Sequence, residues 1–406
     1  MTERAPGEDR RLPLEGIRVL DVSTVIGGPG VATRLGDFGA DVIKVENPGV
    51  GDTTRYFGWR VGGVALWWKL LGRNKRPVTL RLSHPKGQDL LLRLAEASDV
   101  LVESFRPGTL ERWNLGPDRL HERNPRLVIV RISGFGQTGP YAHRPGFGTL
   151  AEAMSGYSHM TGDPDGPPLL PPVALADEVA ALLGAFATMV ALYHRDRNGG
   201  SGQVIDQSLF EGLFGITGPV ATAFDRLGLV TGRHGNRLPY VAPRNTYRTV
   251  DDRWVALSGT SQSVADRILK AIGRADLVTD PRFATNEARV EHVEELDDII
   301  GEWMGRHTLQ EAMTAFEVHE AAASPIYDIR EIFADLQYRA RGTLVRVPDD
   351  DLGAVVLPAV QPRLSETPGR IRHPGLPLGS ANQDVYLREL GLSEEELGRL
   401  REEGVV

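Results

Sequence analysis

The sequence predicts an α/β protein in which a large doubly wound, parallel-sheet domain of the Rossmann-like kind is joined to a smaller α+β domain. In the first two hundred residues, short β-branched runs alternate with segments whose apolar residues recur every three or four positions. Near-continuous apolar strands separated by helices are typical of a parallel sheet covered on both faces. Beyond residue 228 the pattern changes to a hairpin followed by helices, which indicates the second domain.

The elements of the large domain follow one another along the chain. We expect strands at residues 17–22, 41–45, 77–80, 99–102 and 127–132, with helices at 29–38, 85–97 and 115–122. A long helix is predicted at residues 176–195, because the glycines after Asn198 mark a helix end. A strand at 204–206 and a helix at 208–223 complete this part.

The smaller domain is predicted from its own run of elements. A hairpin is expected at residues 245–250 and 253–257, and helices at 263–272, 286–304 and 308–319. The tail carries two strands, 344–347 and 354–357, and an acidic helix at 393–403. The expected boundaries are therefore 1–227 for the N-terminal part of the large domain, 228–325 for the small domain, and 326–406 for the return to the large domain.

Composition excludes several classes of function. The chain has 406 residues, of which 41% are hydrophobic and 25% charged, as in ordinary globular proteins. A net charge of −8 argues against a general nucleic-acid binder. We expect no membrane partner and a cytoplasmic location, because no apolar run reaches about 18 residues and the first ten residues are polar. Cysteine is absent and the histidines are scattered, so neither disulfides nor a metal site are predicted.

One segment departs from the acidic balance. Residues 44–112 hold twelve Lys and Arg against seven Asp and Glu. Either this is a solvated, Arg-rich surface, or it binds a phosphorylated ligand, because guanidinium groups match phosphate geometry. The glycines at 27–30, followed by Glu46, resemble a dinucleotide-binding turn. Thr33 stands where that pattern needs its third glycine, which disfavours a nicotinamide cofactor.

Two glycine-rich segments are the most informative part of the chain. Residues 131–141 (RISGFGQTGPY) read as a strand that ends in a glycine turn, and residues 161–168 (TGDPDGPP) lead into 174–180 (ALADEVA). Asp177 thus lies in the first turn of the predicted long helix. Taken alone, such an acid is a favourable partner of the helix dipole.

Together with residues 14–21 (LEGIRVLD) and 39–46 (GADVIKVE), these segments resemble the class III CoA-transferase family. That family includes formyl-CoA transferase, carnitine CoA-transferase and the α-methylacyl-CoA racemases. The resemblance implies an acyl-CoA:carboxylate CoA-transferase with Asp177 as its nucleophile, and an interlocked homodimer. It also implies coenzyme A, carried as acyl-CoA, and a small carboxylic acid as substrates, with no prosthetic group.

The implied chemistry needs one carboxylate. A carboxylate attacks an acyl-CoA thioester to give a mixed anhydride and free CoA thiolate, and the exchange passes through an aspartyl-CoA thioester before the carboxylate is regenerated. Backbone N–H groups near glycines can approach the developing oxyanion. The turn at residues 134–136 and the segment 259–262 are the expected sources of such donors.

Several further positions are assigned by the same resemblance. They fall where the family contacts coenzyme A, and they are Val25, Leu80, Phe105, Arg112 and Phe135. Gln137 and Tyr141 flank the glycine turn; each is predicted to orient an acyl carbonyl or a coenzyme A amide, or else to be an ordinary loop residue. The chain departs from the family at Ser83, where a phosphate-contacting Lys is usual, and Arg81 is the expected substitute.

Two alternatives remain beside the transferase. The racemases of the family use a His for proton transfer, and here Phe147 occupies its position, which disfavours racemase or isomerase chemistry. A coenzyme A-binding protein without catalysis would not need an acid at Asp177. The segment 258–262 differs from the poly-Gly loop of formyl-CoA transferases, which disfavours oxalate and formate as substrates.

Overall fold

The computed structural model describes residues 11–406, so the polar N-terminal decapeptide lies outside the described residues. The chain divides into two compact units, each with its own core. The first comprises residues 11–157, 170–219 and 340–406; the second comprises 158–169 and 220–339. The main part of the second unit therefore runs from residue 220 to residue 339, whereas the sequence predicts 228–325. The short segment 158–169 also belongs to this unit.

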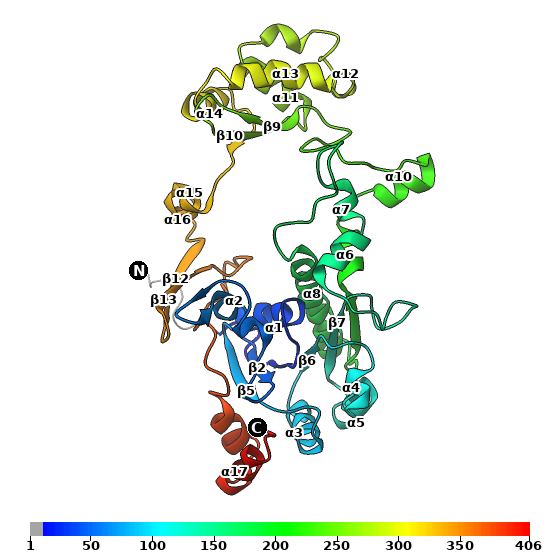
Figure 1. The fold of residues 1–406 in the computed structure, drawn as a ribbon, viewed down its shortest axis with the longest axis vertical. Helices are drawn as coiled ribbons and strands as arrows, with labels where there is room; N and C mark the ends of the chain where they lie inside the picture. Colours follow the sequence, from blue (N-terminus) through cyan, green and yellow to red (C-terminus); the bar gives the residue numbers. More distant parts are fainter. Residues whose placement is uncertain (1–10) are drawn as a thin grey trace. The chain divides into compact units, whose positions relative to one another are not determined.

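The first unit is built on a parallel six-stranded sheet (Figure 1). From edge to edge the strands are β5 (Lys75–Thr79), β2 (Asp41–Glu46), β1 (Arg18–Asp21), β6 (Val100–Glu103), β7 (Val128–Ser133) and β8 (Val204–Ser208). In chain order along this sheet the arrangement is 3-2-1-4-5-6, the doubly wound order of dinucleotide-binding folds. The predicted fold class and the strands of this sheet are confirmed.

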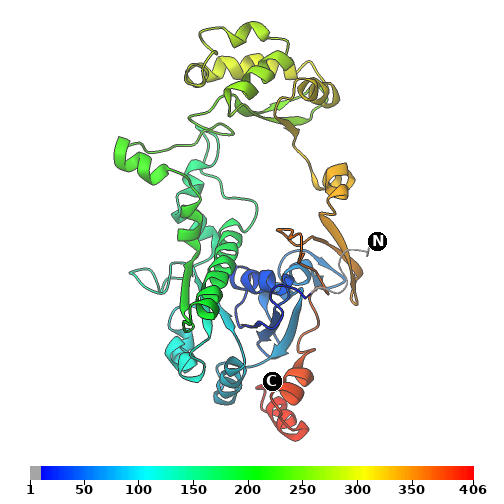
Figure 2. The same cartoon turned by 180° about the vertical axis from the view of Figure 1, so that it is seen from behind.

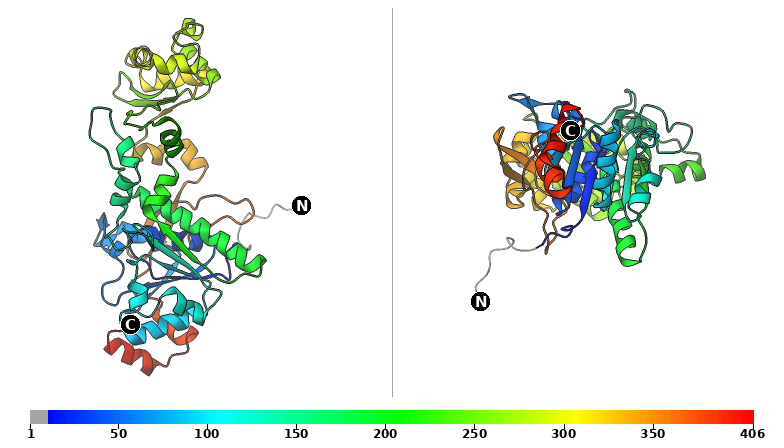
Figure 3. Two further views of the ribbon diagram at one scale, coloured as in Figure 1. Left: turned by 90° about the vertical axis from the view of Figure 1, so that its right-hand side faces the viewer. Right: turned by 90° about the horizontal axis from the view of Figure 1, so that it is seen from below.

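Helices cover both faces of the sheet because neighbouring strand residues point to opposite sides. Val19 packs with α1 (Gly27–Asp37) and the long α8 (Leu175–Arg197), whereas Leu20 packs with α3 (Pro85–Glu96) and α5 (Pro117–Arg123). Figure 2 shows green α8 beside blue α1, and the left view of Figure 3 shows α8 and α3 on opposite sides of the strands. All four helices were predicted from the sequence, within a few residues at each end.

Smaller elements of the first unit surround this framework. The C-terminal segment adds the antiparallel pair β12 (Leu344–Asp349) and β13 (Gly353–Pro358), a helical turn (Gln383–Glu389) and α17 (Glu394–Glu402). Short elements that the sequence analysis did not identify are η1 (Thr53–Arg55), β3 (Arg60–Val61), β4 (Val64–Ala65), α2 (Leu66–Leu71), α4 (Thr109–Arg112), α6 (Gly148–Met154) and α7 (Tyr157–Met160), which ends in the second unit.

Helix α8 is long and apolar enough, by length and composition, to cross a membrane. It packs against α1, α6, α9 (Leu209–Gly215), β7 and β8 within the first unit. The apolar residues on one side of α8 therefore pack in the core of the first unit. The other side carries exposed large apolar residues: Leu182, Phe186, Val190 and Tyr193.

The second unit holds an antiparallel sheet in the order β11 (Ala323–Pro325), β10 (Trp254–Ser258), β9 (Arg244–Arg248). The predicted hairpin is confirmed as β9 and β10. Helices flank the sheet and follow it: α11 (Gln262–Ala271), η2 (Ala275–Val278), α12 (Asn286–Glu291), α13 (Val293–Met304), α14 (Leu309–Val318), α15 (Ile329–Ala334) and α16 (Leu336–Ala340).

Two helices predicted as continuous are interrupted. The helix expected at 208–223 becomes α9 and α10 (Val220–Leu227), since Gly218 takes a φ of 76° and Pro219 cannot donate a helical hydrogen bond. The helix expected at 286–304 divides at His292, whose backbone (φ −108°, ψ 31°) leaves the helical region. The apolar pattern runs through both breaks, so periodicity alone did not reveal them.

Candidate active site

The predicted coenzyme A contacts of the first unit lie in segments that follow the carboxyl ends of β1, β5, β6 and β7, and the loops after β1 and β6 lie at the centre of this edge. Strands β1 and β6 are neighbours, and the chain order of the sheet reverses between them, which is where ligands bind in doubly wound sheets. The loops that follow the two strands are tied together: Thr24 N–H donates to Ser104 Oγ at 2.9 Å, and Ser104 Oγ donates to the Thr24 carbonyl at 3.1 Å. The loop after β1 then enters α1 at Gly27.

Asp177 lies in the first turn of α8, close to two glycines that begin other helices. The backbone N–H of Gly27, at the start of α1, donates to the Asp177 carboxylate. A Cβ on Gly148, at the start of α6, would collide with Asp177 Oδ2. The carboxylate therefore lies beside the N-termini of α1, α6 and α8, and the sequence leaves room for it by placing glycine at position 148.

The surroundings of Asp177 raise its pKa to about 6. Burial of the carboxylate is the first cause, and the negative charge of Glu152 is the second. The hydrogen bond from Gly27 acts in the opposite direction. Glu152 is buried on α6, and its Oε1 accepts a hydrogen bond from the N–H of Ala176 at 3.3 Å. Asp177 thus remains largely ionised at pH 7 yet is more basic than an exposed aspartate.

Two of the predicted coenzyme A contacts share a cavity. Leu80 and Phe105 line an opening of about 260 Å³ that also borders Thr24, Asp52 and Trp113. Trp113 packs edge-on against Phe105, with ring centroids 5.2 Å apart. Arg81 and Ser83 line the same cavity, so the cation expected to replace the family's Lys lies at the same place as Ser83. A larger cavity of about 570 Å³ beside β12 contains none of the predicted site residues.

The other predicted contacts lie around this core. Val25 follows β1 with a φ of 71°, a left-handed conformation that is rare for a β-branched residue. Arg112 ends α4 beside Trp113 but is exposed and outside the cavity lining; its Nη2 donates to Thr109 Oγ1 at 2.9 Å.

The glycine turn after β7 carries the remaining three. Phe135 meets Tyr141 and Phe210, with ring centroids 6.2 and 6.3 Å away. The backbone N–H of Gln137 donates to Asp206 Oδ2 at 2.9 Å. Within residues 11–406, the buried Nε2 of Gln137 has no hydrogen-bond partner.

The structure also corrects the reading of the basic segment. Seven of its twelve cations form ion pairs and are therefore not free to bind an anion; they are Lys44, Arg55, Lys69, Arg73, Lys75, Arg76 and Lys86. Of these seven, only Lys86 is exposed. Glu46, whose position suggested a ribose contact, instead binds Arg55 Nε and Nη2 at 2.7 Å each. The dinucleotide interpretation is therefore not supported at this residue.

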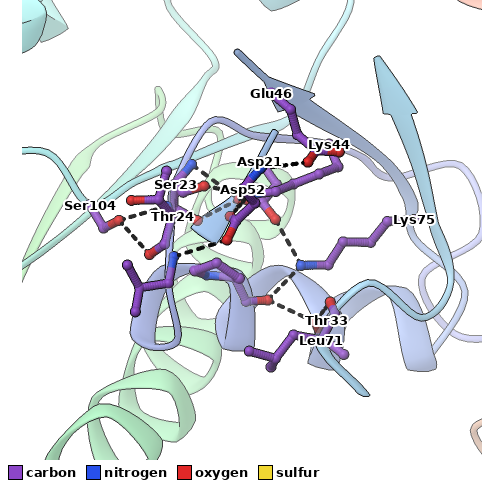
Figure 4. Close-up of polar contacts among 12 residues, drawn as sticks. Asp21, Ser23, Thr24, Thr33, Lys44, Glu46, Asp52, Leu71, Lys75 and Ser104 are labelled. Atoms are coloured by element: carbon purple, nitrogen blue, oxygen red, sulfur yellow. Dashed lines mark hydrogen bonds and ion pairs between the residues drawn. The ribbon is translucent and has the colours of Figure 1, made fainter. Parts of the chain in front are cut away.

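Sequence reasoning missed Glu152 and a buried cluster of charges beneath the site. Figure 4 shows the cluster, in which Asp21, Lys44, Asp52 and Lys75 converge below the loop after β1. All four are buried. One signal was available for Lys44, because it interrupts the apolar run of the predicted strand at residues 41–45. Lys75 lies outside the strand predicted at 77–80 and carried no such signal. No such signal marks Glu152, which belongs to a short helix that was not predicted.

Comparison with known proteins assigns the family. The profile of CoA-transferase family III matches residues 14–382. The chain belongs to this family. It is 41% identical, over 97% of this chain and 98% of the relative, to a succinyl-CoA–D-citramalate CoA-transferase of Chloroflexus aurantiacus. It is 35% identical, over 94% and 96% of the two chains, to a succinate–glutarate CoA-transferase of Agrobacterium fabrum.

Solved structures agree with this assignment. A crystal structure of a CaiB/BaiF family protein from Brucella suis superimposes with a TM-score of 0.82, at 31% identity, over 93% of this chain and all of that one. A Mycobacterium tuberculosis protein gives a TM-score of 0.83 at 28% identity, over 94% of this chain and all of that one.

The family III chain is accordingly an enzyme, a CoA-transferase, and its substrates include coenzyme A thioesters. Across the described range, no group of three or more His, Asp and Glu side chains is arranged to hold a metal ion.

Proposed function

We propose that this enzyme moves coenzyme A from an acyl-CoA to a free carboxylate through covalent intermediates on Asp177. The Asp177 carboxylate attacks the thioester carbonyl carbon, forming an anhydride C–O bond and expelling CoA thiolate. The thiolate then attacks the aspartyl carbonyl, which releases the donor acid and leaves an aspartyl-CoA thioester. The acceptor carboxylate then attacks the carbonyl of the aspartyl-CoA thioester, which expels CoA thiolate and forms a second mixed anhydride. The thiolate attacks the acceptor's carbonyl carbon in this anhydride, which gives the new acyl-CoA and frees the Asp177 carboxylate.

The position of Asp177 carries this proposal. A carboxylate with a pKa near 6 is ionised at neutral pH and more nucleophilic than an ordinary aspartate. The surrounding helix N-termini supply positive dipole ends to the negative charge that develops on the attacked carbonyl oxygen. A packing role alone would be met by a neutral residue without desolvating a charge.

The relatives suggest the substrates. Those named here are CoA-transferases of succinyl-CoA or succinate with citramalate or glutarate. We therefore propose succinyl-CoA as donor and a short dicarboxylate as acceptor. Coenzyme A is proposed to bind at Val25, Leu80, Phe105, Arg112 and Phe135, with Arg81 contacting a phosphate. Gln137, whose Nε2 is unpaired among the described residues, and Tyr141 are proposed to orient the acyl end.

We test the mechanism by intact-protein mass spectrometry after mixing with succinyl-CoA. Wild type is expected to gain a coenzyme A-sized or acyl-sized adduct, which hydroxylamine converts to a hydroxamate. Asp177→Ala and Asp177→Asn are expected to gain none while still binding coenzyme A. Loss of the donor thioester without any adduct in wild type contradicts the covalent route. Racemisation of a 2-methylacyl-CoA without transfer favours the isomerase alternative, whose proton-transfer position holds the exposed Phe147.

The proposal includes a homodimer. Along α8, Leu182, Phe186, Val190 and Tyr193 recur at helical spacing and are each more than half exposed. Such a continuous apolar row on a folded chain marks a protein interface. A second copy of this chain is the partner that the family resemblance implies.

A further inference from the structure

The loop between β1 and α1 is held at every residue from 23 to 25 by groups from other elements. The carbonyl of Ser23 accepts a hydrogen bond from Lys44 Nζ. Thr24 is bound through both its N–H and its carbonyl to Ser104 Oγ. The N–H of Val25 lies 3.4 Å from Asp52 Oδ1 and donates to it. Figure 4 shows the contacts of Ser23 and Thr24.

Lys44 and Asp52 form one buried pair behind these contacts. Lys44 Nζ lies 3.0 Å from Asp52 Oδ2, and the two side chains are each 1% exposed. Asp52 Oδ1 is oriented by the N–H and Oγ1 of Thr54, at 2.9 and 2.8 Å. Asp21 and Lys75, 2.8 Å apart, continue the cluster, and Lys75 also donates to the Pro29 carbonyl in α1 at 2.8 Å.

A cluster of four buried charges is thermodynamically unfavourable for an element that serves the fold alone. Burying four charges costs desolvation free energy that ion pairing only partly returns, and apolar packing of the same volume is often as stable. The loop also keeps Val25 at a φ of 71°, a conformation that a β-branched residue leaves unless its surroundings hold it. Strain of this kind, supported by a buried network, is characteristic of functional sites.

The loop connects the cavity to the nucleophile. Thr24 and Asp52 line the cavity that contains Leu80 and Phe105. Two residues after Val25, the N–H of Gly27 donates to the Asp177 carboxylate. The backbone of residues 24–27 therefore runs between the proposed coenzyme A site and the atom that attacks the thioester.

We propose that Lys44 and Asp52 are positioning residues for the transfer reaction: they hold the Val25 backbone in its left-handed conformation, so that residues 24–27 align the bound thioester with Asp177. The inference rests on the proposed function. Neither residue touches the reacting atoms; each acts through the loop.

The test is a comparison of kcat and KM for succinyl-CoA and acceptor in Asp52→Asn and Lys44→Met, each corrected for the folded fraction. We expect kcat to fall by about 10- to 100-fold, because small misplacements of a reacting group cost rates of this order, with KM for succinyl-CoA changed less than about threefold. Asp37→Asn is the matched control: it removes a buried carboxylate paired with Arg73 at 2.7 Å at the other end of α1. Its Tm should fall while its kcat stays at the wild-type value.

A double-mutant cycle separates positioning from general destabilisation. Glycine adopts positive φ without strain, so Val25→Gly removes the need for Asp52 to hold that conformation. The loss caused by Asp52→Ala is expected to be at least about threefold smaller in the Val25→Gly background than in wild type. Equal losses in both backgrounds, or an unchanged kcat in Asp52→Asn, overturn the inference. In either case the Asp177 adduct in wild type would still stand, whereas its absence would remove the proposed function itself.

Discussion

Glu152 lies against the start of the helix that carries Asp177, and its charge raises the pKa of the Asp177 carboxyl. The two carboxylates come from α6 and α8; Glu152 is buried and Asp177 is partly buried. Repulsion between them favours the protonated form of Asp177, in addition to the effect of burial. A nucleophile tuned in this way has a pH dependence that can be measured.

The first prediction concerns the pH profile of the reaction. Because Asp177 reacts as the carboxylate, kcat/KM for succinyl-CoA should rise with pH up to about 6 and level off above it. Glu152→Gln removes the nearby negative charge, so the midpoint of the profile should move to lower pH. Initial rates between pH 4.5 and 8.5 measure both midpoints.

Glu178→Gln is the graded control for this profile. Glu178 also raises the pKa of Asp177, but its effect ranks below that of Glu152, and it pairs with Arg34. Its midpoint should therefore move in the same direction by a smaller amount. A Glu152→Gln midpoint equal to or above the wild-type value contradicts the role given to Glu152.

The second prediction concerns stability. A carboxyl whose pKa is raised on folding binds more protons in the folded state between pH about 4 and 6, so the free energy of unfolding falls as pH rises through that window. At pH 7.5 Asp177 is ionised, and its unfavourable contribution to the free energy of unfolding has reached its full size. Asp177→Asn should accordingly raise Tm at pH 7.5 by about 1–3 °C while abolishing transfer. The difference in Tm should shrink toward pH 4.

Thermal unfolding by differential scanning calorimetry at pH 7.5 and pH 4.5 measures this effect. Glu178→Gln provides the contrast, because that residue forms an ion pair with Arg34 and its loss should not raise Tm. A Tm of Asp177→Asn below wild type at pH 7.5 would mean that the carboxylate stabilises the fold.

The sequence predicts those features of this site that depend on residues close to one another along the chain. Asp177 is singled out because the glycine-rich segments and the helix start around it resemble the class III family; taken alone, it is an ordinary acid at a helix start. The strands of the sheet are predicted because their apolar runs are continuous. Glu152 is not found, since it belongs to a different, short helix and meets Asp177 only after folding. The same holds for Asp52, which reaches Lys44 and Val25 through loops outside the regular pattern.

The cavity lined by Leu80 and Phe105 could not be predicted from the sequence either. Leu80 and Phe105 follow β5 and β6, which are not neighbours in the sheet, so their shared cavity depends on the strand order. The interpretation of residues 44–112 as a solvated surface or an anion site failed for a related reason. Charge counts along the chain do not reveal that Lys69 pairs with Asp349, which lies 2.6 Å away but far along the sequence.

The third prediction uses the contact between α6 and the nucleophile. Gly148→Ala places a methyl group where Asp177 Oδ2 now lies, so the carboxylate must shift. Transfer should fall by at least about 100-fold, because misplacement of a reacting group is costly, while binding of coenzyme A measured by calorimetry should change little. Gly398→Ala in α17 is the control: a methyl group there meets open space, and activity should stay at the wild-type value.

The last prediction concerns the exposed row on α8. Phe186 is 68% exposed in the single chain, and Leu182 and Val190 lie one turn away on either side. If a second copy covers this row, Phe186→Glu buries a charge in the interface and should convert a dimer to monomer, with Tm lowered. Light scattering after size exclusion, at micromolar concentration, measures the mass. Arg197→Glu, at the end of the same helix, reverses a charge without touching the row and should leave the dimer intact. A wild-type chain that is monomeric, or a Phe186→Glu variant that stays dimeric, removes α8 as the interface.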